Sequence, residues 1–279
     1  MRAAYYEANG AAREVLRLSE VETPQPGRGE VRVRLAVSGV NPSDVKSRAG
    51  LTRKIAFPRV IPHSDGAGEI DQVGEGVSPS RVGERVWVWN GQWRRPFGTA
   101  AQSIVLPSEQ AVPLPAHIGM DVGACLGIPA YTAKGEIARR AGADHVVDYK
   151  REEVGERIMA LTGKRGVDAA IEVDLAANAR LLPTVLAPNG VVAIYGSGAP
   201  EASIPFQFLL QNSITLKFFL VYLMPQEQRA RATADITRML ERGELVHNVA
   251  QSFDLGAIVA AHEAVESGKA MGNIVVRIA

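Results

Sequence analysis

The sequence predicts an α/β fold in which a β-rich N-terminal domain precedes a doubly wound parallel sheet. Two observations carry this prediction: short strands punctuated by Gly and Pro extend to about residue 117, and helices alternate with strands from about residue 119 onward. The chain has 279 residues, of which 46% are hydrophobic and 22% charged, as is typical of a globular protein with a core. This length allows one large domain or two ordinary ones.

The N-terminal part shows the alternation of apolar and polar residues that marks half-buried strands. The alternation is clearest in Val31–Val37, and Gly66–Val73 and Arg85–Trp89 look like further strands. Turn signals separate these segments, among them Thr23–Gly27 and Gly74–Gly76. Short strands with frequent turns predict a small barrel or sandwich.

The C-terminal part repeats a strand–helix–strand pattern. Strands are expected at His145–Val147, Val167–Ile171, Gly190–Tyr195, Ile214–Phe219 and Asn273–Ile278, and helices at Arg151–Leu161, Leu175–Leu186, Gln226–Arg242 and Ile258–Glu266. The helix that begins at Gln226 should end at Gly243. Repeated βαβ units imply a parallel, doubly wound sheet.

Charge and cysteine content exclude several classes of protein. The formal net charge is +1, so no strong field favours nucleic acid or an anionic membrane as a partner. The single cysteine, Cys125, excludes a disulfide framework and a multi-cysteine zinc site, and it favours a cytoplasmic location. The chain opens without an apolar signal core, and its longest apolar stretch, around Phe218–Met224, is too short to span a bilayer.

Seven short segments follow one another in a characteristic order. They are Gly39–Asp44, Ile61–Gly68, Val73–Val77, Val82–Val86, Gly127–Ala133, Ala141–His145 and Gly268–Ile274. Each segment is weak evidence alone, but the ordered set resembles the zinc-free quinone oxidoreductase branch, the ζ-crystallin-like group, of the medium-chain dehydrogenase/reductase superfamily. The resemblance covers nearly the whole chain.

The resemblance implies a layout of two domains. A GroES-like β-barrel substrate domain would occupy residues 1–120, and a Rossmann-type nucleotide-binding domain would occupy residues 121–256. A C-terminal helix and strand, residues 257–279, would return to the first domain. The implied chemistry is hydride transfer from NADPH to a quinone or another conjugated carbonyl acceptor in the cleft between the domains.

The same resemblance implies catalysis without zinc. Zinc-dependent relatives place a cysteine at the position of Asn41 and a histidine at the position of Ser64, and neither Asn nor Ser is a usual zinc ligand. His63 lies next to the ligand position. We expect it to be a hydrogen-bonded loop residue, because a lone histidine does not make a metal site.

One segment of the family pattern is missing. Relatives continue from the Gly127–Ala133 motif into the first Rossmann strand, a Gly-rich turn, a helix and a second strand. Here Ala133 leads directly into Lys134–Arg140, which resembles the helix after the second strand. Roughly 40–50 residues are absent, somewhat more than a ~30-residue βαβ unit, and no complete G-x-G-x-x-G motif occurs elsewhere in the sequence.

This absence has a physical consequence. Strands 1 and 2 occupy the middle of a Rossmann sheet, so without them the strands at His145 and Val167 lose their neighbours. Each unpaired buried backbone group costs about 1–3 kcal/mol, and the cofactor pyrophosphate loses its helix N-terminus.

Three explanations of the missing segment compete. The natural polypeptide contains the segment, or the chain is truly short and repaired by re-pairing or by a partner chain, or the protein is a remnant that no longer binds cofactor. The first is favoured, because the other two must bear the cost of the gap in the sheet.

Two residues of the N-terminal part are candidates for the active site. Asn41 resembles the family's cleft asparagine, whose amide is suited to polarising a carbonyl, and Asn41-Pro42 would form a turn in any case. Lys46 stands where many relatives carry a tyrosine on the cofactor side, although it could equally be a surface lysine. A reduced quinone oxygen can take its protons from solvent, so hydride transfer needs little further acid–base machinery.

The resemblance also implies residues that bind the cofactor. They are Lys46, Thr132, Tyr149, Gly196, Ser197, Gly198, Phe219, Leu220 and Val221. Thr132 would lie near the nicotinamide ribose or serve only as a capping residue. Tyr149 would contact the adenosine 2′-phosphate, which favours NADPH over NADH, or it could be an ordinary residue at a strand end.

The remaining cofactor residues follow strands at their carboxyl ends, where ligands bind in such sheets. The glycines of Gly196-Ser197-Gly198 would let the backbone approach the nicotinamide, although an ordinary turn needs the same glycines. Phe219–Val221 would hold the carboxamide or simply end an apolar strand. Asp174 and Asn178 are expected near the same strand ends, and they are weaker candidates for cofactor binding.

The sequence leaves three functions open. The favoured one is a cytoplasmic NADPH:quinone or enone reductase that forms a homodimer through the strand near Ile214. An alkene or enoyl-thioester reductase of the same architecture is the alternative enzyme. A non-catalytic remnant, whose nucleotide domain serves only assembly, is the alternative from another class.

Overall fold

The structure of this protein is a computed structural model that describes residues 1–127, 142–196, 198–245 and 248–278. The chain divides into two compact units. The first unit comprises Met1–Lys134 and Ala230–Ala279, and the second unit comprises Gly135–Arg229. The domain boundaries expected near residues 120 and 256 stay a prediction.

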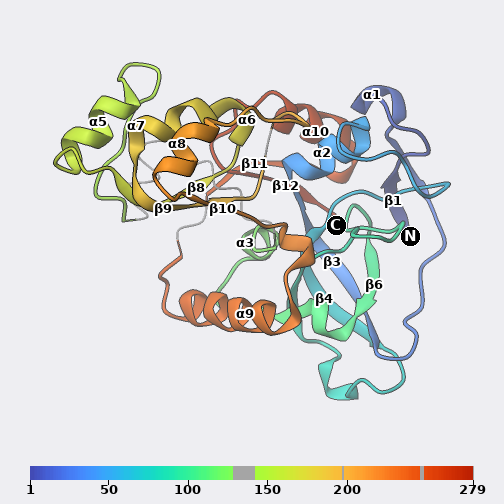
Figure 1. The fold of residues 1–279 in the computed structure, drawn as a ribbon. Helices are drawn as coiled ribbons and strands as arrows, with labels where there is room; N and C mark the ends of the chain where they lie inside the picture. The colour runs from blue at the N-terminus through green and yellow to red at the C-terminus, as the bar shows by residue number, and fades with distance from the viewer. Residues whose placement is uncertain (128–141, 197, 246–247, 279) are drawn as a thin grey trace. The chain divides into compact units, whose positions relative to one another are not determined.

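The first unit is built on a seven-stranded sheet (Figure 1). Its strand order is β11-β12-β3-β4-β5-β7, with β6 also paired to β3, and among the described residues this order does not close into a ring. The strands are β3 (Glu30–Val40), β4 (Asp65–Val73), β5 (Arg85–Val88), β6 (Ser103–Pro107), β7 (Ala111–Pro113), β11 (Val249–Asp254) and β12 (Asn273–Arg277). The long β3 holds the sheet together, because β12 pairs with its C-terminal half and β6 with its N-terminal half.

Shorter elements complete the first unit. They are β1 (Arg2–Tyr5), α1 (Ala12–Val15), β2 (Arg17–Glu20), α2 (Pro42–Ala49), the 3₁₀ turns Pro79–Arg81, Ser108–Gln110 and Leu255–Ala257, α3 (Met120–Gly123) and α10 (Ile258–Glu266). Helix α9 (Gln226–Glu241) begins in the second unit and continues into the first. The core contains the inward residues of β3, such as Val31 and Val33, together with Ile258 and Ala261 of α10. No described helix is long and apolar enough to cross a membrane.

The second unit is a three-stranded parallel sheet in the order β10-β9-β8. Its elements are α5 (Val154–Leu161), β8 (Val167–Glu172), α6 (Leu175–Asn178), the 3₁₀ turn Ala179–Leu181, α7 (Leu182–Val185), β9 (Leu186–Ile194), α8 (Phe206–Gln211), β10 (Thr215–Phe218) and the 3₁₀ turn Val221–Leu223. Helices α6 to α8 pack on one face of this sheet through Leu182, Leu209, Val192 and Ile194 (Figure 1).

Most elements expected from the sequence are present, and the α/β fold is confirmed. Helix α10 has the predicted bounds. Helix α9 ends before Gly243, as predicted, because the φ of 66° at this glycine is left-handed and cannot continue a right-handed helix. The helix expected over 175–186 is broken into three short turns, with Pro183 inside the third. The strand expected at His145–Val147 is wrong: these residues form no strand. The described sheet offers no strand beside them for pairing.

The opposite face and one edge of the three-stranded sheet are open among the described residues. Ile171 of β8 is 79% exposed and Val191 of β9 is 39% exposed. β8 pairs only with β9, so its outer edge has no neighbouring strand in the described part of the chain. Parallel sheets are normally covered on both faces. The described part of the second unit therefore has the open edge and face that the missing βαβ segment predicts.

Candidate functional site

Asn41 lies where β3 ends and α2 begins. Its extended backbone (φ −108°, ψ 157°) makes it the N-cap of α2, and Pro42 follows at the first helical position. Its side chain is buried, and its Nδ2 donates to Asp65 Oδ2 at 2.8 Å. The turn predicted from Asn41-Pro42 is present, and the role of the Asn41 amide toward a substrate stays a prediction.

Two buried carboxyl groups hold Asn41. Asp44 Oδ2 accepts from the Asn41 backbone N at 2.8 Å, and burial raises the pKa of Asp44 to about 7. Asp65 takes one of the two hydrogens on the Asn41 amide nitrogen. Gly127 lies against this pair, since a Cβ there would meet Asp65 Oδ1 at 2.1 Å. The Asn41 side chain also hydrogen-bonds to Asp44, so both carboxyl groups fix the amide.

His63 lies in the loop before β4 and is fully buried. Its Nδ1 is 2.8 Å from Ser38 Oγ, and its Nε2 is 2.9 Å from His262 Nε2 of α10. Burial lowers the pKa of His63 to about 3 and lowers the pKa of His262 as well. The prediction of a hydrogen-bonded loop residue is confirmed. His262 was missed, because nothing near it in the sequence marks it as a partner.

Ser64 and Lys46 complete the first-unit positions singled out by the sequence. The Ser64 carbonyl accepts from Gly91 N at 2.8 Å, so it positions the loop after β5. Lys46 lies on α2 and is half-buried. Among the described residues, no group of three or more His, Cys, Asp or Glu side chains is placed to hold a metal ion.

In the second unit, the carboxyl ends of the three strands form one rim. Asp174, which follows β8, caps α6, and its Oδ1 accepts from Gly198 N at 2.7 Å. Phe219, which follows β10, donates its N–H to Ile194 O of β9 at 2.9 Å, and its ring lies 5.8 Å from that of Tyr195. The structure therefore places Phe219 beside Tyr195, the residue before Gly196, and joins Gly198 to Asp174.

The glycines of this rim are required by packing alone. A Cβ on Gly196 would meet Val173 O at 2.3 Å, and one on Gly198 would meet Asp174 Oδ2 at 2.7 Å. Their presence therefore does not by itself indicate a ligand. Phe219 and Leu220 are each 43% exposed at the rim, where a planar ring could lie against them.

Tyr149 is exposed and lines a groove of the second unit with Arg180, Asn178 and Met159. The cation nearest the Tyr149 ring is Lys150, whose Nζ lies 6.0 Å from the ring centroid. Thr132 and Ser197 lie outside the described residues. The described part of the chain contains no Gly-rich turn that could hold the pyrophosphate of a nicotinamide cofactor.

Two family profiles match the chain. Residues 27–116 match the alcohol dehydrogenase GroES-like domain, and residues 141–276 match a zinc-binding dehydrogenase domain. The two matches leave residues 117–140 between them, the stretch in which the family pattern is interrupted.

Curated relatives span nearly the whole chain. A 2-haloacrylate reductase from Burkholderia sp is 23% identical over 314 positions, covering 92% of this chain and 93% of the relative. A quinone oxidoreductase from Pseudomonas aeruginosa is 24% identical over 314 positions, covering 94% and 95%. Both alignments are longer than the 279 residues of the chain, so the excess falls on positions that the relatives have and this chain lacks. A quinone oxidoreductase from Rattus norvegicus is 31% identical over 67% of this chain and 54% of the relative.

Solved structures share the fold. An NAD-dependent alcohol dehydrogenase superimposes with a TM-score of 0.87 at 24% identity over 100% of both chains. A mycobacterial protein in complex with NADPH superimposes with a TM-score of 0.84 at 21% identity, covering 99% of this chain and 100% of that chain. The ordered motifs, both profiles and these relatives agree. The chain therefore belongs to the quinone oxidoreductase branch of the medium-chain dehydrogenase/reductase superfamily.

Proposed function

We propose that this protein is a zinc-free reductase that transfers hydride from NADPH to a quinone or another conjugated carbonyl acceptor. The observation that carries the proposal is the Asn41 amide, which is buried and held in a fixed orientation by Asp65. The family membership supplies the reaction class. Asn41 and Ser64 at the zinc-ligand positions support chemistry without zinc.

The chain's own contribution would be positioning and charge stabilisation. NADPH supplies the hydride when it is bound. As hydride reaches the acceptor, negative charge develops on its carbonyl oxygen, and a fixed amide N–H in a dry site stabilises such charge. Asp65 keeps the amide from rotating, so little reorganisation is needed during the reaction. The reduced oxygen takes its proton from solvent.

Further details are part of the proposal. The exposed Tyr149, in a groove also lined by Arg180, supports NADPH over NADH. The outer edge of β10, which pairs only with β9 among the described residues, supports a homodimer formed through that strand. A single, buried cysteine supports a reducing compartment such as the cytoplasm.

The test is NADPH oxidation by purified protein with a quinone, measured for the wild type and Asn41→Ala. We expect Asn41→Ala to lower kcat/KM roughly tenfold to a hundredfold, because loss of one such donor typically costs this much or more. Asn189→Gly, at an exposed left-handed position of the second unit, is the matched control and should leave the rate unchanged. Equal rates for wild type and Asn41→Ala would contradict the assigned role.

The alternative from another class is a non-catalytic protein, and the open β8 edge favours it. Fluorescence titration with NADPH separates the two: a wild type that shows no binding supports the non-catalytic protein. Activity with an enoyl thioester but not with a quinone would instead indicate the alternative enzyme.

A further inference from the structure

Two guanidinium groups gather over one indole ring in the first unit. The Cζ of Arg53 lies 5.6 Å from the centroid of the Trp93 ring, and the Cζ of Arg94 lies 5.5 Å from it. Among the described residues, neither arginine has a carboxylate within ion-pair distance. The charge of Arg53 acts on the buried carboxyl of Asp44, but no ion pair in the described part of the chain neutralises either guanidinium. Like charges repel, so two guanidinium groups over one ring mark a place where an anion would be favoured.

The hydrogen bonds that hold Arg53 in position go to neutral groups. Its Nε donates to Ser47 Oγ at 2.8 Å, and its Nη2 donates to Gln92 Oε1. Gln92 is buried, and its own amide nitrogen donates to Arg95 O at 3.0 Å. A guanidinium has five N–H donors. Two are used, so three stay available to a ligand while the side chain is already ordered.

This arginine–tryptophan cluster, defined as Arg53, Trp93 and Arg94, is connected to Asn41 from two sides. Ser47 lies on α2, the helix that Asn41 caps, and six residues at about 1.5 Å each place it about 9 Å further along the helix. The loop that carries Trp93 begins at Gly91, whose N–H donates to the carbonyl of Ser64, the residue before Asp65. Asp65 is the group that orients the Asn41 amide.

We propose that the arginine–tryptophan cluster binds an anionic group, a carboxylate or sulfonate, on the acceptor whose carbonyl meets Asn41. A planar guanidinium grips such a group with two N–H donors, and the indole adds a surface for a flat ring. The preferred substrates are therefore acidic conjugated carbonyl compounds. This inference rests on the proposed function, and it adds a choice among acceptors that the family's chemistry does not specify.

Arg59 provides a matched control. It also lies over an aromatic ring, with its Cζ 4.3 Å from the centroid of Tyr5. Unlike Arg53, it has a carboxylate partner, because Glu7 Oε1 accepts from its Nη2 at 2.8 Å. Arg59→Gln removes the same charge and the same kind of ring contact at a site that is already neutralised.

The experiment compares 1,2-naphthoquinone with 1,2-naphthoquinone-4-sulfonate as acceptors. We expect wild type to prefer the sulfonate, and Arg53→Gln to lower the sulfonate-to-neutral ratio of kcat/KM at least tenfold, mainly through KM. Arg59→Gln should leave that ratio within twofold of wild type. A ratio that Arg53→Gln does not change overturns the inference. So does an increase in the KM for NADPH that is the same with both acceptors, because the cluster would then serve the cofactor.

A binding measurement separates this inference from the proposed function. Calorimetric titration with 2-naphthoate, which cannot be reduced, should give binding to wild type and Arg59→Gln, and at least tenfold weaker binding to Arg53→Gln. If no acceptor is reduced but this pattern is found, the reductase assignment fails and the anion site stands. If quinones are reduced but 2-naphthoate binds all three proteins equally or binds none of them, the anion site fails. Thermal unfolding of each variant checks that it is folded.

Discussion

The two units treat the same residue type in opposite ways. Ile70 of β4 in the first unit is 0% exposed, whereas Ile171 of β8 in the second unit is 79% exposed. The first unit also buries Arg48, His63 and His262, and contacts with distant segments satisfy most of their polar atoms, with Arg48 Nε and His262 Nδ1 as exceptions. The second unit buries apolar residues on one face only. In the described part of the chain, the first unit therefore has a packed core that includes polar groups, whereas the second unit leaves one face of its sheet exposed.

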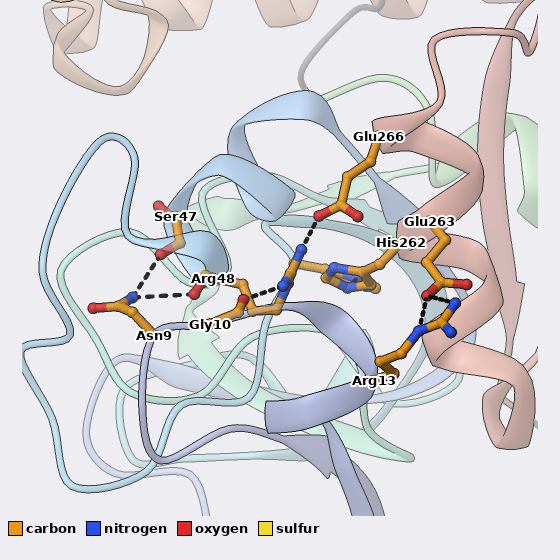
Figure 2. Close-up of polar contacts among 9 residues, drawn as sticks. Asn9, Gly10, Arg13, Ser47, Arg48, His262, Glu263 and Glu266 are labelled. Atoms are coloured by element: carbon orange, nitrogen blue, oxygen red, sulfur yellow. Dashed lines mark hydrogen bonds and ion pairs between the residues drawn. The ribbon is translucent and has the colours of Figure 1, made fainter.

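The largest expected effect comes from Arg48, whose side chain is fully buried in the first unit. Its guanidinium donates to Gly10 O and Glu266 and so connects α2, the N-terminal segment and α10 (Figure 2). We expect Arg48→Ala to lower the free energy of unfolding by about 3–5 kcal/mol, as breaking a buried pair does. Chemical denaturation measures it. The control is Arg13→Ala, which removes an exposed contact with Glu263 and should cost less than about 1 kcal/mol.

The next largest effect is expected at the buried Ile70, compared with the exposed Ile171. Ile70→Ala should lower the free energy of unfolding by about 2–5 kcal/mol, because it opens a cavity in a packed core. Ile171→Ala should change it by no more than about 0.5 kcal/mol, because the side chain is exposed. A loss of more than about 2 kcal/mol in the free energy of unfolding for Ile171→Ala would contradict this difference between the two units. It would show that another segment or chain covers β8 in solution.

Buried titratable groups make the first unit sensitive to pH. His63 and His262 have lowered pKa values when folded, so their contribution to stability is present above their unfolded pKa of about 6.5 and is lost as pH falls, by about 1.4 kcal/mol per pH unit each. Asp44 has a raised pKa of about 7, so it acts in the opposite sense: its burial destabilises the fold as pH rises from about 4 to 7.

As pH falls from about 6 to 4.5, protonation of the two histidines destabilises the fold and protonation of Asp44 acts in the opposite sense. Asp44→Asn removes the opposing contribution and should steepen the loss of stability by about 1 kcal/mol per pH unit. Denaturant unfolding at several pH values measures the slope, and Asp254→Asn, at an exposed carboxylate, should leave it unchanged. Parallel slopes for wild type and Asp44→Asn would contradict the pKa of Asp44.

The smallest effect is a difference in labelling that leaves stability unchanged. Cys125 is buried, its thiol donates to Asp121 O at 3.1 Å, and burial raises its pKa to about 12. A thiol reagent at neutral pH should label it slowly in the native protein and rapidly in denaturant. Ile171→Cys introduces a second thiol on the second unit, which should react at the rate of the denatured chain. Equal native rates at both positions would contradict the difference in burial.

Much of the fold follows from local patterns in the sequence. Alternation located β3 and β4, and helical periodicity with Gly243 as a stop located α9, because each signal depends on near neighbours in the chain. The prediction of a strand at His145–Val147 was wrong because a short apolar run becomes a strand only beside a partner strand, and pairing depends on distant segments. The gap itself was found by comparison with a family pattern, and periodicity alone gave no sign of it.

The site could be predicted only in part. The sequence identified Asn41, and its Asn-Pro pattern also predicted the turn. It did not indicate Asp65 or His262, because their contacts with Asn41 and His63 join residues 24 and 199 positions apart. It also did not indicate that Arg53 and Arg94 meet over Trp93, because the two arginines belong to separate loops.

The buried contacts of His63 form a chain of hydrogen bonds that can have only one direction. The Thr99 hydroxyl donates to Asp65 O at 2.6 Å, so it must accept from the Ser38 hydroxyl, 2.7 Å away. Ser38 then accepts from Nδ1–H of His63, which leaves the Nε2 of that ring as an acceptor for Nε2–H of His262. Each imidazole is thereby confined to one tautomer. The nitrogen left without a partner, Nδ1 of His262, carries a lone pair and no proton, and a missing partner is tolerated better at an acceptor than at a donor.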